Sequence, residues 1–397
     1  MLLTTKFKNA LYLYEFELDY ILFHINHTKK YFEKTIEINY AEYFKLNGPL
    51  KLETFIENTI KENQIDIIFI FIFDNNFEFS PLFLSSLKNK CKLVFWLFDE
   101  EFLQQTFTKY YTQTADAVII TDYLGRAYYE KLDIPTILYF SSYSKSEYFP
   151  VEVKKEYDVT FVGEVRDERL KYINLLKDNG IKVEIFGRGS KNGIVSMEEM
   201  NIIFNKSKIN LNFTAVQIIP WIQKFDTVTV NRVKQNKGRP IEIALTKNFC
   251  LSEYAPSLKY VFEIGKEIDY FRNADELLTK VKYYLENENI RNEISNNAYN
   301  RAINEYESDI YLKKVLIELF EKLNNSTYKN QDECLIYESD YFKKRRLFFY
   351  ARNIRRKLKK MQFNLALSSL KYLLKNNYSF ISILTAIIID LLKLNKY

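Results

Sequence analysis

The chain has 397 residues, of which 47% are hydrophobic and 27% are charged. This length and composition exclude a disordered protein and a single small module, and they predict at least two domains. The formal net charge is +6, but residues 331–397 hold 14 Lys and Arg against five Asp and Glu, which leaves the first 330 residues net acidic. The body of the chain therefore lacks the overall positive charge of a nucleic-acid-binding protein.

Three features predict a cytoplasmic protein. The cysteines Cys91, Cys250 and Cys334 are far apart and match no metal-binding spacing, as expected for reduced thiols. The amino-terminal segment lacks the basic, apolar and small-residue zones of a signal peptide. No apolar run reaches about 18 residues, so no membrane-spanning helix is expected.

Strand-like and helix-like segments alternate through the first 150 residues. NALYLY, IDIIFIFIF and KLVFWLF are short apolar runs typical of strands buried in a parallel sheet. Segments with apolar residues at helical spacing separate them, and Ser80 before Pro81 predicts a capped helix start. This alternation predicts a doubly wound α/β domain over residues 1–150.

The same alternation restarts after a connector near residue 150. YDVTFVG and IKVEIFG predict strands that end at Gly163 and Gly187, and KINLNF predicts a third. Ser196, with Glu199 three residues later, forms a capping box before a further helix. The pattern predicts a second Rossmann-like domain over residues 151–330.

Residues 331–397 have a different character. Segment 341–360 holds ten basic residues and no acidic one, and its apolar side chains recur near helical spacing. Two helical segments follow, and the last one, with Asp390 inside, is too short to span a membrane and is expected to pack on its neighbours. Three roles stay open for this basic helical tail: docking on the body or a second subunit, docking on an anionic membrane surface, or contact with another macromolecule.

Glycines and charged side chains gather at the predicted strand ends of the second domain and at a helix entrance in NKGRPIEIALTKNFCLSEY. They are Gly163, Arg166, Gly187, Arg188, Gly189, Lys237, Arg239 and Glu242. Each group alone also fits an ordinary turn or helix start. Together they predict a nucleotide-sugar site, because glycine admits close backbone approach, arginine binds phosphate in a bidentate manner and a carboxylate accepts hydrogen bonds from a ribose diol.

The order of these segments resembles the carboxyl-terminal half of the GT-B glycosyltransferases, most closely the bacterial branch related to the CgeB spore-maturation protein. The resemblance extends from about residue 91 to 320 and is most specific between 157 and 285. It implies two Rossmann-like domains that face a cleft, with a nucleotide-sugar donor, expected to be a UDP-sugar, on the second domain. It also implies neither a cofactor nor a metal ion, since the nucleotide sugar is a substrate.

The family's functional residues carry over onto matching positions. The glutamate at the helix entrance binds the nucleotide ribose in that family, which corresponds to Glu242. Basic residues that hold the pyrophosphate correspond to Arg239, Lys237 and Arg166, and the Gly187-Arg188-Gly189 turn corresponds to the turn beside the base.

Two positions depart from the family pattern. Many retaining relatives carry a second glutamate eight residues before the helix glutamate, where this chain has Lys234. The usual glycine of the helix-to-strand turn is replaced in LTKNF. A retaining or an inverting outcome therefore stays open.

In the first domain, VFWLFDEEF resembles the family's strand that ends in Trp-x-x-Asp. Asp99 would then be the general base that deprotonates the acceptor hydroxyl. The alternative is that Asp99 or Glu100 only caps the next helix, and Glu100 and Asp74 are the next candidates for the base. His24 and His27 have no third ligand nearby, so a surface or packing role is expected for them rather than metal binding.

The sequence as a whole predicts a hexosyltransferase of GT-B type. It would move a sugar from a nucleotide-diphosphate donor to a hydroxyl group of a glycan, lipid-linked or protein acceptor. A nucleotide-sugar epimerase on the same fold would need an acid/base pair around the sugar ring that the sequence does not show. A nucleic-acid-binding protein would depend on the basic tail alone. The loop at about 214–235, where donor specificity is expected, carries no readable pattern.

Overall fold

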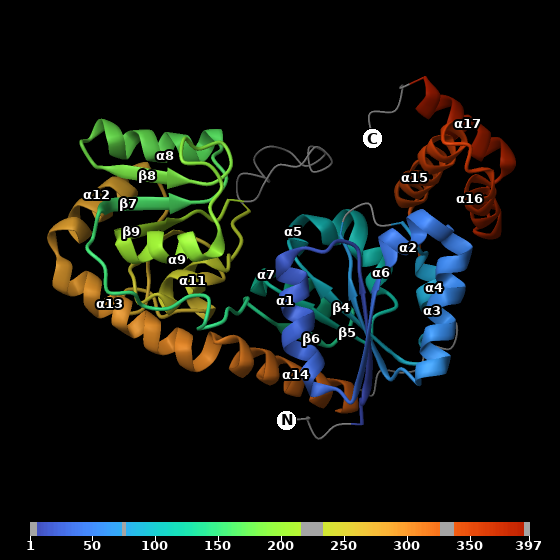
Figure 1. Ribbon diagram of the computed structural model, residues 1–397, viewed down its shortest axis with the longest axis horizontal. Helices are drawn as coiled ribbons and strands as arrows, with labels where there is room; N and C mark the ends of the chain where they lie inside the picture. The colour runs from blue at the N-terminus through green and yellow to red at the C-terminus, as the bar shows by residue number, and fades with distance from the viewer. Residues whose placement is uncertain (1–5, 74–76, 216–232, 326–336, 393–397) are drawn as a thin grey trace. The chain divides into compact units, whose positions relative to one another are not determined.

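The computed structural model describes residues 6–73, 77–215, 233–325 and 337–392, which divide into two compact units (Figure 1). The first unit comprises Met1–Ile120, Gly125–Leu138 and Leu316–Tyr397, and the second comprises Thr121–Leu124 and Tyr139–Val315. Each unit is built on one parallel sheet, which confirms the predicted fold class. The connector 139–150 belongs to the second unit, where the Phe149 amide donates to the side chain of Asn201 in helix α9 (Met197–Lys206).

The first unit has a six-stranded parallel sheet in the order β2-β1-β3-β4-β5-β6. All five residues of β3 are buried, as expected for a central strand covered on both faces. The strands are β1 (Asn9–Tyr14), β2 (Lys34–Asn39), β3 (Ile67–Phe71), β4 (Lys92–Leu97), β5 (Ala117–Ile120) and β6 (Thr136–Leu138). The helices between them are α1 (Asp19–Thr28), α2 (Tyr40–Asn47), α3 (Pro49–Asn63), α4 (Pro81–Ser85), α5 (Glu100–Leu103), α6 (Lys109–Thr112) and α7 (Tyr123–Glu130). Ser80 accepts a hydrogen bond from the Phe83 amide at 3.0 Å, which confirms the predicted start of α4.

The second unit has a five-stranded parallel sheet in the order β11-β10-β9-β7-β8. Its strands are β7 (Tyr157–Val162), β8 (Val183–Phe186), β9 (Ser207–Asn212), β10 (Cys250–Glu253) and β11 (Asp269–Phe271). Its helices are α8 (Asp167–Asp178), α9 (Met197–Lys206), α11 (Arg239–Leu245), α12 (Ala274–Glu286) and α13 (Glu288–Arg301), and α14 (Ser308–Asn325) runs from this unit into the first. The capping box of Ser196 and Glu199 is present at the start of α9, as predicted.

The carboxyl-terminal tail forms three helices that belong to the first unit (Figure 1). They are α15 (Asp340–Lys359), α16 (Phe363–Lys375) and α17 (Phe380–Leu391). Phe342, Tyr350 and Ile354 of α15 lie in the core of the first unit, and the Tyr350 hydroxyl donates to the carbonyl oxygen of Phe77 at 2.7 Å. The buried apolar side chains of segment 341–360 therefore serve docking on the body, which is one of the predicted roles, and contact of this segment with a membrane or a second subunit stays a prediction.

Several of the basic residues in 341–360 are also used within the tail. Arg346 forms an ion pair with Glu338, and its side chain is buried. Arg352 and Arg355 both pair with Asp390 of α17, which explains how this carboxylate can lie buried on an otherwise apolar helix. Within the described ranges, no helix combines the length and the apolar character needed to cross a membrane.

Candidate functional site

The topology of the second unit marks one edge of its sheet. After β8 the chain crosses to the other side of β7 and forms β9, so strand order reverses between β7 and β9. Doubly wound sheets bind ligands outside the carboxyl ends of their strands at such a reversal. The residues that follow these strand ends, beginning with Gly163 after β7 and Phe213 after β9, are therefore the candidates for a binding site.

Two glycine turns lock together at this edge, as the sequence predicts. The Val165 amide donates to the carbonyl oxygen of Arg188 at 2.9 Å. Gly187 has a φ of +119°, and a Cβ atom there would lie 2.3 Å from the carbonyl oxygen of Gly163, so no other residue fits. Gly189, with a φ of +82°, completes the second turn, on which Arg188 is exposed. The structure thus brings the predicted residues after β7 and β8 into one backbone cradle.

Two arginines stand beside this cradle at the start of α8. Arg166 pairs with Glu164 at 2.9 Å, and Arg169 donates to the carbonyl oxygen of Glu164 at 2.8 Å. The Arg169 guanidinium lies 5.4 Å and 5.9 Å from the ring centroids of Phe161 and Phe213. Burial, followed by the charge of Arg166, lowers the pKa of Arg169 to about 10. Two cations at a helix amino terminus suit a phosphate-bearing ligand.

Arg169 was not predicted from the sequence. The available signal was its spacing of three residues from Arg166, which places Arg166 at the N-cap of α8 and Arg169 on its first turn. The pattern of a strand-end glycine followed by an arginine identified only Arg166 as a candidate, and not Arg169.

The other predicted residues lie at the entrance of α11 and have different partners. Arg239 pairs with Glu242 three residues later, and its guanidinium contacts the Met200 sulfur and lies 5.4 Å from the Phe204 ring centroid on α9. Glu242 is only 7% exposed, so this is a largely buried pair of opposite charges. Lys237 folds back to donate to the side chain of Gln235.

The turn before α11 approaches a tyrosine closely. A Cβ atom at Gly238 would lie 1.9 Å from the hydroxyl oxygen of Tyr143, which explains the glycine in the sequence Lys-Gly-Arg. Burial, and then the charge of Glu242, raise the pKa of Tyr143 and of Tyr148 far above the usual value. Both phenols therefore stay protonated beside the carboxylate.

Glu253 at the end of β10 interacts both with Lys234, which precedes α11, and with Arg169, which lies beside the glycine turns. This buried carboxylate pairs with Lys234 at 2.6 Å and accepts hydrogen bonds from the amides of Thr214 at 2.8 Å and Ala215 at 3.1 Å. Its charge also raises the pKa of Arg169, against the larger lowering by burial. In the sequence, Lys234 stands out only as a departure from the family pattern, and Glu253 was not predicted, although NFCLSE ends a strand with an acidic residue.

A second missed carboxylate anchors the approach to α11. Asp122 accepts hydrogen bonds from the Asn236 amide at 2.8 Å and from the Ser257 hydroxyl at 2.6 Å, and it is buried. Asp122 and Asn236 are 114 positions apart in the sequence, so no local pattern signalled this contact. The residues just before Lys237 and Arg239 are thus held by two buried acids, Glu253 through Lys234 and Asp122 through Asn236.

In the first unit, Asp99 and Glu100 follow the end of β4 and differ in environment. Asp99 is exposed, has a left-handed φ of +55° and makes no side-chain capping bond to α5. Glu100 is buried and accepts hydrogen bonds from Thr108 at 2.8 Å and from Tyr129. Burial raises the pKa of Glu100 to about 7, despite these hydrogen bonds. Asp74, the remaining candidate, lies outside the described residues.

The two histidines of α1 pack against aromatic rings. The ring centroids of His24 and Trp96 are 5.0 Å apart, and those of His27 and Phe23 are 4.2 Å apart. Burial lowers the pKa of His24 to about 4, so its imidazole is neutral at physiological pH. These contacts agree with the expected packing role.

Residues 168–316 match the family described as glycosyl transferase-like. HepE of Anabaena, solved in complex with UDP-glucose, has a TM-score of 0.56 and is 12% identical, over 79% of this chain and 99% of that one. Sucrose-phosphate synthase from Thermosynechococcus elongatus has a TM-score of 0.54 at 9% identity, over 79% and 99% of the two chains. A glycosyltransferase from Rickettsia africae has a TM-score of 0.52 at 13% identity, over 81% and 100%. No curated protein sequence matches the chain.

The family match covers α8 to α14 and so includes the Gly187 turn, Glu253 and the entrance of α11, while Gly163 and Arg166 precede it. The solved structures are too distant in sequence to show more than the fold. The chain therefore has the GT-B fold of two Rossmann-like units, and its residues 168–316 are similar to the glycosyl transferase-like family.

Proposed function

We propose that the protein is a glycosyltransferase that moves a sugar from a UDP-linked donor to an acceptor hydroxyl group. The observation that carries this proposal is the carboxyl edge of the second sheet, where a glycine cradle, two arginines and the start of α8 meet at the strand reversal. This edge adjoins and partly overlaps the glycosyl transferase-like region. The fold is shared with HepE, which was solved with UDP-glucose, and this supports the choice of donor.

In this proposal the diphosphate of the donor lies over the glycine cradle. Gly163 and Gly187 allow the two turns to pack closely against each other, and Arg166 and Arg169 beside these turns neutralise the charge of the diphosphate oxygens. As the bond between the anomeric carbon and the phosphate oxygen breaks, negative charge grows on the departing UDP. Fixed guanidinium groups stabilise that charge, so the proposal needs no metal ion for this step.

Glu242 is proposed to accept hydrogen bonds from the ribose hydroxyls. Arg239 then acts as a positioning residue, because its ion pair holds the carboxylate at the entrance of α11. Lys237 adds positive charge to the same entrance, and Glu253 with Lys234 holds the chain after β9 in place.

Asp99 is proposed to act on the acceptor. Its carboxylate would take the proton from the acceptor hydroxyl while the acceptor oxygen bonds to the anomeric carbon. The electron pair of the broken glycosidic bond leaves with UDP. Exposure and the left-handed backbone of Asp99 support this role, since strained residues gather at functional sites.

We further propose that the acceptor is presented at an anionic membrane surface, with α16 and α17 as the contact. On α17, four exposed apolar residues recur every three or four positions and form one stripe: Ile381, Leu384, Ile388 and Leu391. Phe363 and Leu367 are exposed on α16, next to exposed Lys371. Apolar side chains beside lysines suit binding at a membrane surface, and each lysine near anionic lipid contributes about 1 kcal/mol.

Sedimentation with lipid vesicles tests the membrane contact. The protein should sediment with vesicles that contain phosphatidylserine and stay in solution with phosphatidylcholine alone, and Ile388→Asp should abolish the difference. Equal behaviour of the wild type with both vesicles at low salt would remove the membrane from the proposal without affecting the donor site.

A screen of nucleotide sugars tests the enzymatic function. We expect a UDP-sugar to raise the thermal unfolding temperature and to be consumed when glycan, lipid-linked and protein acceptors are offered. Analysis of the sugar after incubation without an acceptor separates the alternative, because an epimerase would convert the donor by itself. No stabilisation by any nucleotide sugar at millimolar concentration would contradict a donor site on the second unit.

A further inference from the structure

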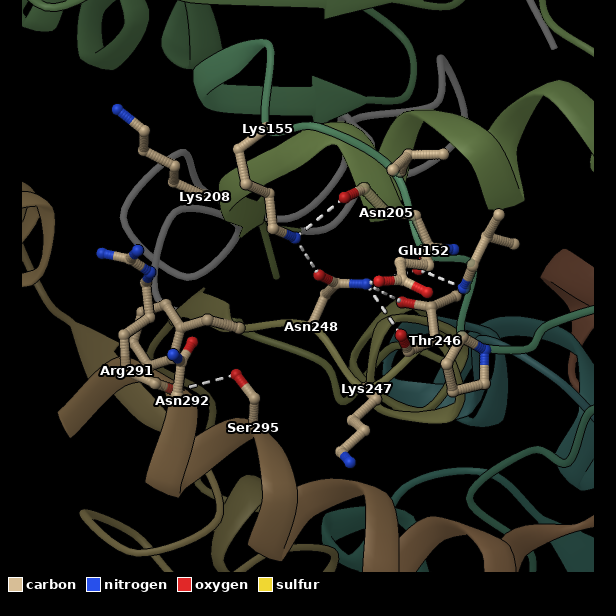
Figure 2. A pocket seen from close by; sticks show the side chains of 14 residues that line it. Glu152, Lys155, Asn205, Lys208, Thr246, Lys247, Asn248, Arg291, Asn292 and Ser295 are labelled. Atoms are coloured by element: carbon tan, nitrogen blue, oxygen red, sulfur yellow. Dashed lines mark hydrogen bonds between the residues drawn. The ribbon is translucent and has the colours of Figure 1, made fainter. Parts of the chain in front are cut away.

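A pocket lies at the edge of the second unit's sheet that is opposite the proposed donor site (Figure 2). Its volume is about 230 Å³. Residues just before or at the start of β7, β9 and β10 line it, including Lys155, Lys208 and Phe249. Since the strands are parallel, this edge carries their amino ends, whereas the proposed donor site uses their carboxyl ends. At about 3.3 Å per residue, the length of β9 separates the two edges by roughly 20 Å.

The lining of this pocket is strongly basic. Lys155, Lys208, Lys247 and Arg291 come from four separate segments of the chain, and the pocket lining contains one acidic residue, Glu152. Positive charges that repel one another are brought together here by the fold. Such a concentration is stabilised when an anion binds among the charges.

Lys155 and Arg291 differ from the other two cations of this cluster, because uncharged acceptors hold their charged groups. The Lys155 ammonium donates to the carbonyl oxygen of Asn205 at 2.8 Å and to the side-chain oxygen of Asn248, toward which it points in Figure 2. Arg291 is buried and donates to the carbonyl oxygen of Tyr284. These acceptors are neutral, so they fix the two cations in place without cancelling their charge.

The electrostatics of Lys155 agree with this geometry. The residue as a whole is exposed, but its ammonium is held at the pocket wall by Asn205 and Asn248. Burial of that group, followed by the charge of Arg291, lowers the pKa of Lys155 to about 8. Glu288, on the first turn of α13, acts in the opposite direction on both residues but does not outweigh these causes. The negative charge of a bound anion would favour the charged form of Lys155, and the pKa of this lysine would therefore rise.

The remaining two cations lie at the rim. Lys208 pairs with Asp158 at 2.7 Å, and Figure 2 shows its ammonium and that of Lys247 directed away from Asn248. Lys247 has a left-handed φ of +60° in the LTKNF turn, where glycine would carry less strain. The chain thus keeps a lysine at a position that favours glycine, which adds charge at the pocket mouth.

We infer that this pocket binds a small phosphate-bearing molecule, with Lys155 and Arg291 as its main ligands and Asn292 and Ser295 beside them. Its volume admits a group larger than a single phosphate but smaller than a nucleotide sugar. The site is independent of the proposed donor site. The two are joined by α11, which begins at Arg239 and ends one residue before Thr246 of the pocket lining.

Calorimetric titration with pyrophosphate tests this inference. The full chain is titrated in saturating UDP, which occupies a donor site if there is one, at pH 8 in two buffers of different ionisation enthalpy. We expect saturable binding, with more protons taken up per bound pyrophosphate in the wild type than in Lys155→Gln, because Lys155 becomes fully charged in the complex and the protons of pyrophosphate itself contribute equally to both. Lys155→Gln should also weaken binding at least tenfold, while Lys182→Gln, which removes an exposed lysine of the same unit, should change neither the affinity nor the proton uptake.

The outcomes separate the alternatives. Binding that is equal in the wild type and in Lys155→Gln, or no saturable binding to the wild type at millimolar pyrophosphate, would overturn the inference. A parallel titration with vesicles containing phosphatidic acid identifies the source of the phosphate: heat from vesicles that is lost in Lys155→Gln indicates a lipid headgroup, and heat from pyrophosphate alone indicates a free metabolite. If UDP does not bind, the proposed donor site is contradicted, whereas the pyrophosphate titration remains a valid test of the pocket.

Discussion

Each unit of the protein has an acidic residue at the carboxyl end of a central strand, and the two residues have opposite environments. Asp99 follows β4, is exposed and has a left-handed backbone without a side-chain cap to α5. Glu253 ends β10, is buried and holds Lys234 and the amides of Thr214 and Ala215. At equivalent positions in the two units, solvent can therefore reach the carboxylate of Asp99, whereas the carboxylate oxygens of Glu253 accept hydrogen bonds from the protein.

The position of a residue at a strand end therefore locates a candidate site, but it does not decide whether that residue has a catalytic or a structural role. A carboxylate that accepts several buried hydrogen bonds positions the chain around it, as Glu253 does. An exposed carboxylate such as Asp99 is accessible to a substrate hydroxyl and is the better candidate for proton transfer.

Replacing Asp99 tests the accessible carboxylate and should have the largest effect. We expect Asp99→Asn to lower turnover by about 100-fold or more, the usual scale for a positioned general base, while donor affinity is unchanged. Steady-state transfer assays and donor titration measure the two quantities. Asp133→Asn is the matched control, since Asp133 is also exposed with a φ of +55° but follows α7 rather than a strand.

Near-normal turnover in Asp99→Asn would reverse the assignment. Glu100 would then be the next candidate in the described chain, and the left-handed conformation of Asp99 would have only a structural meaning.

Replacing Glu253 tests the saturated carboxylate. Glu253→Gln should lower the free energy of unfolding by roughly 1–3 kcal/mol, because Lys234 loses its charged partner in a largely buried place. Lys234→Met in the same chain should recover part of this loss, giving a coupling energy above about 0.5 kcal/mol in a double-mutant cycle. Strictly additive effects in chemical denaturation would show that the pair does not position the chain after β9.

A smaller effect is expected from Glu100, the buried neighbour of Asp99. Its pKa is raised on folding to about 7, so the folded state favours its protonated form. This contribution to stability is present below about pH 4.5 and is lost as pH rises through about 7. Glu100→Gln should therefore gain in unfolding temperature relative to the wild type between pH 4.5 and pH 8.

Glu62→Gln, which replaces an exposed glutamate of α3, serves as the control for that comparison. A constant difference between Glu100→Gln and the wild type across this pH range would mean that Glu100 does not titrate there.

Apolar runs made most of the fold predictable from the sequence. IDIIFIFIF and KLVFWLF became β3 and β4 because a parallel sheet covered on both faces needs such runs. β11 has only three residues and includes Asp269, so no run marked it. Segment 341–360 was predicted as a helix, but periodicity does not say what a helix packs on, and its apolar face proved to be part of the first unit's core.

The candidate site was predictable only where its residues carry a local signal. Glycines at strand ends and the Lys-Gly-Arg turn are visible in the sequence, and the structure gives them the close approaches that require glycine. Asp122 and Glu253 act through partners 114 and 19 residues away, and such pairings depend on the tertiary fold rather than on neighbouring residues. Whether Glu242 and Arg239 bind a donor remains a prediction.

Titration of UDP-glucose into the wild type and Glu242→Gln tests the central claim most directly. We predict saturable binding to the wild type and at least tenfold weaker binding to Glu242→Gln, with a cooperative unfolding transition retained because Gln can still accept a hydrogen bond from Arg239. Glu198→Gln, an exposed change on α9, should bind like the wild type. Equal affinity of the wild type and Glu242→Gln would contradict the placement of the donor at the entrance of α11.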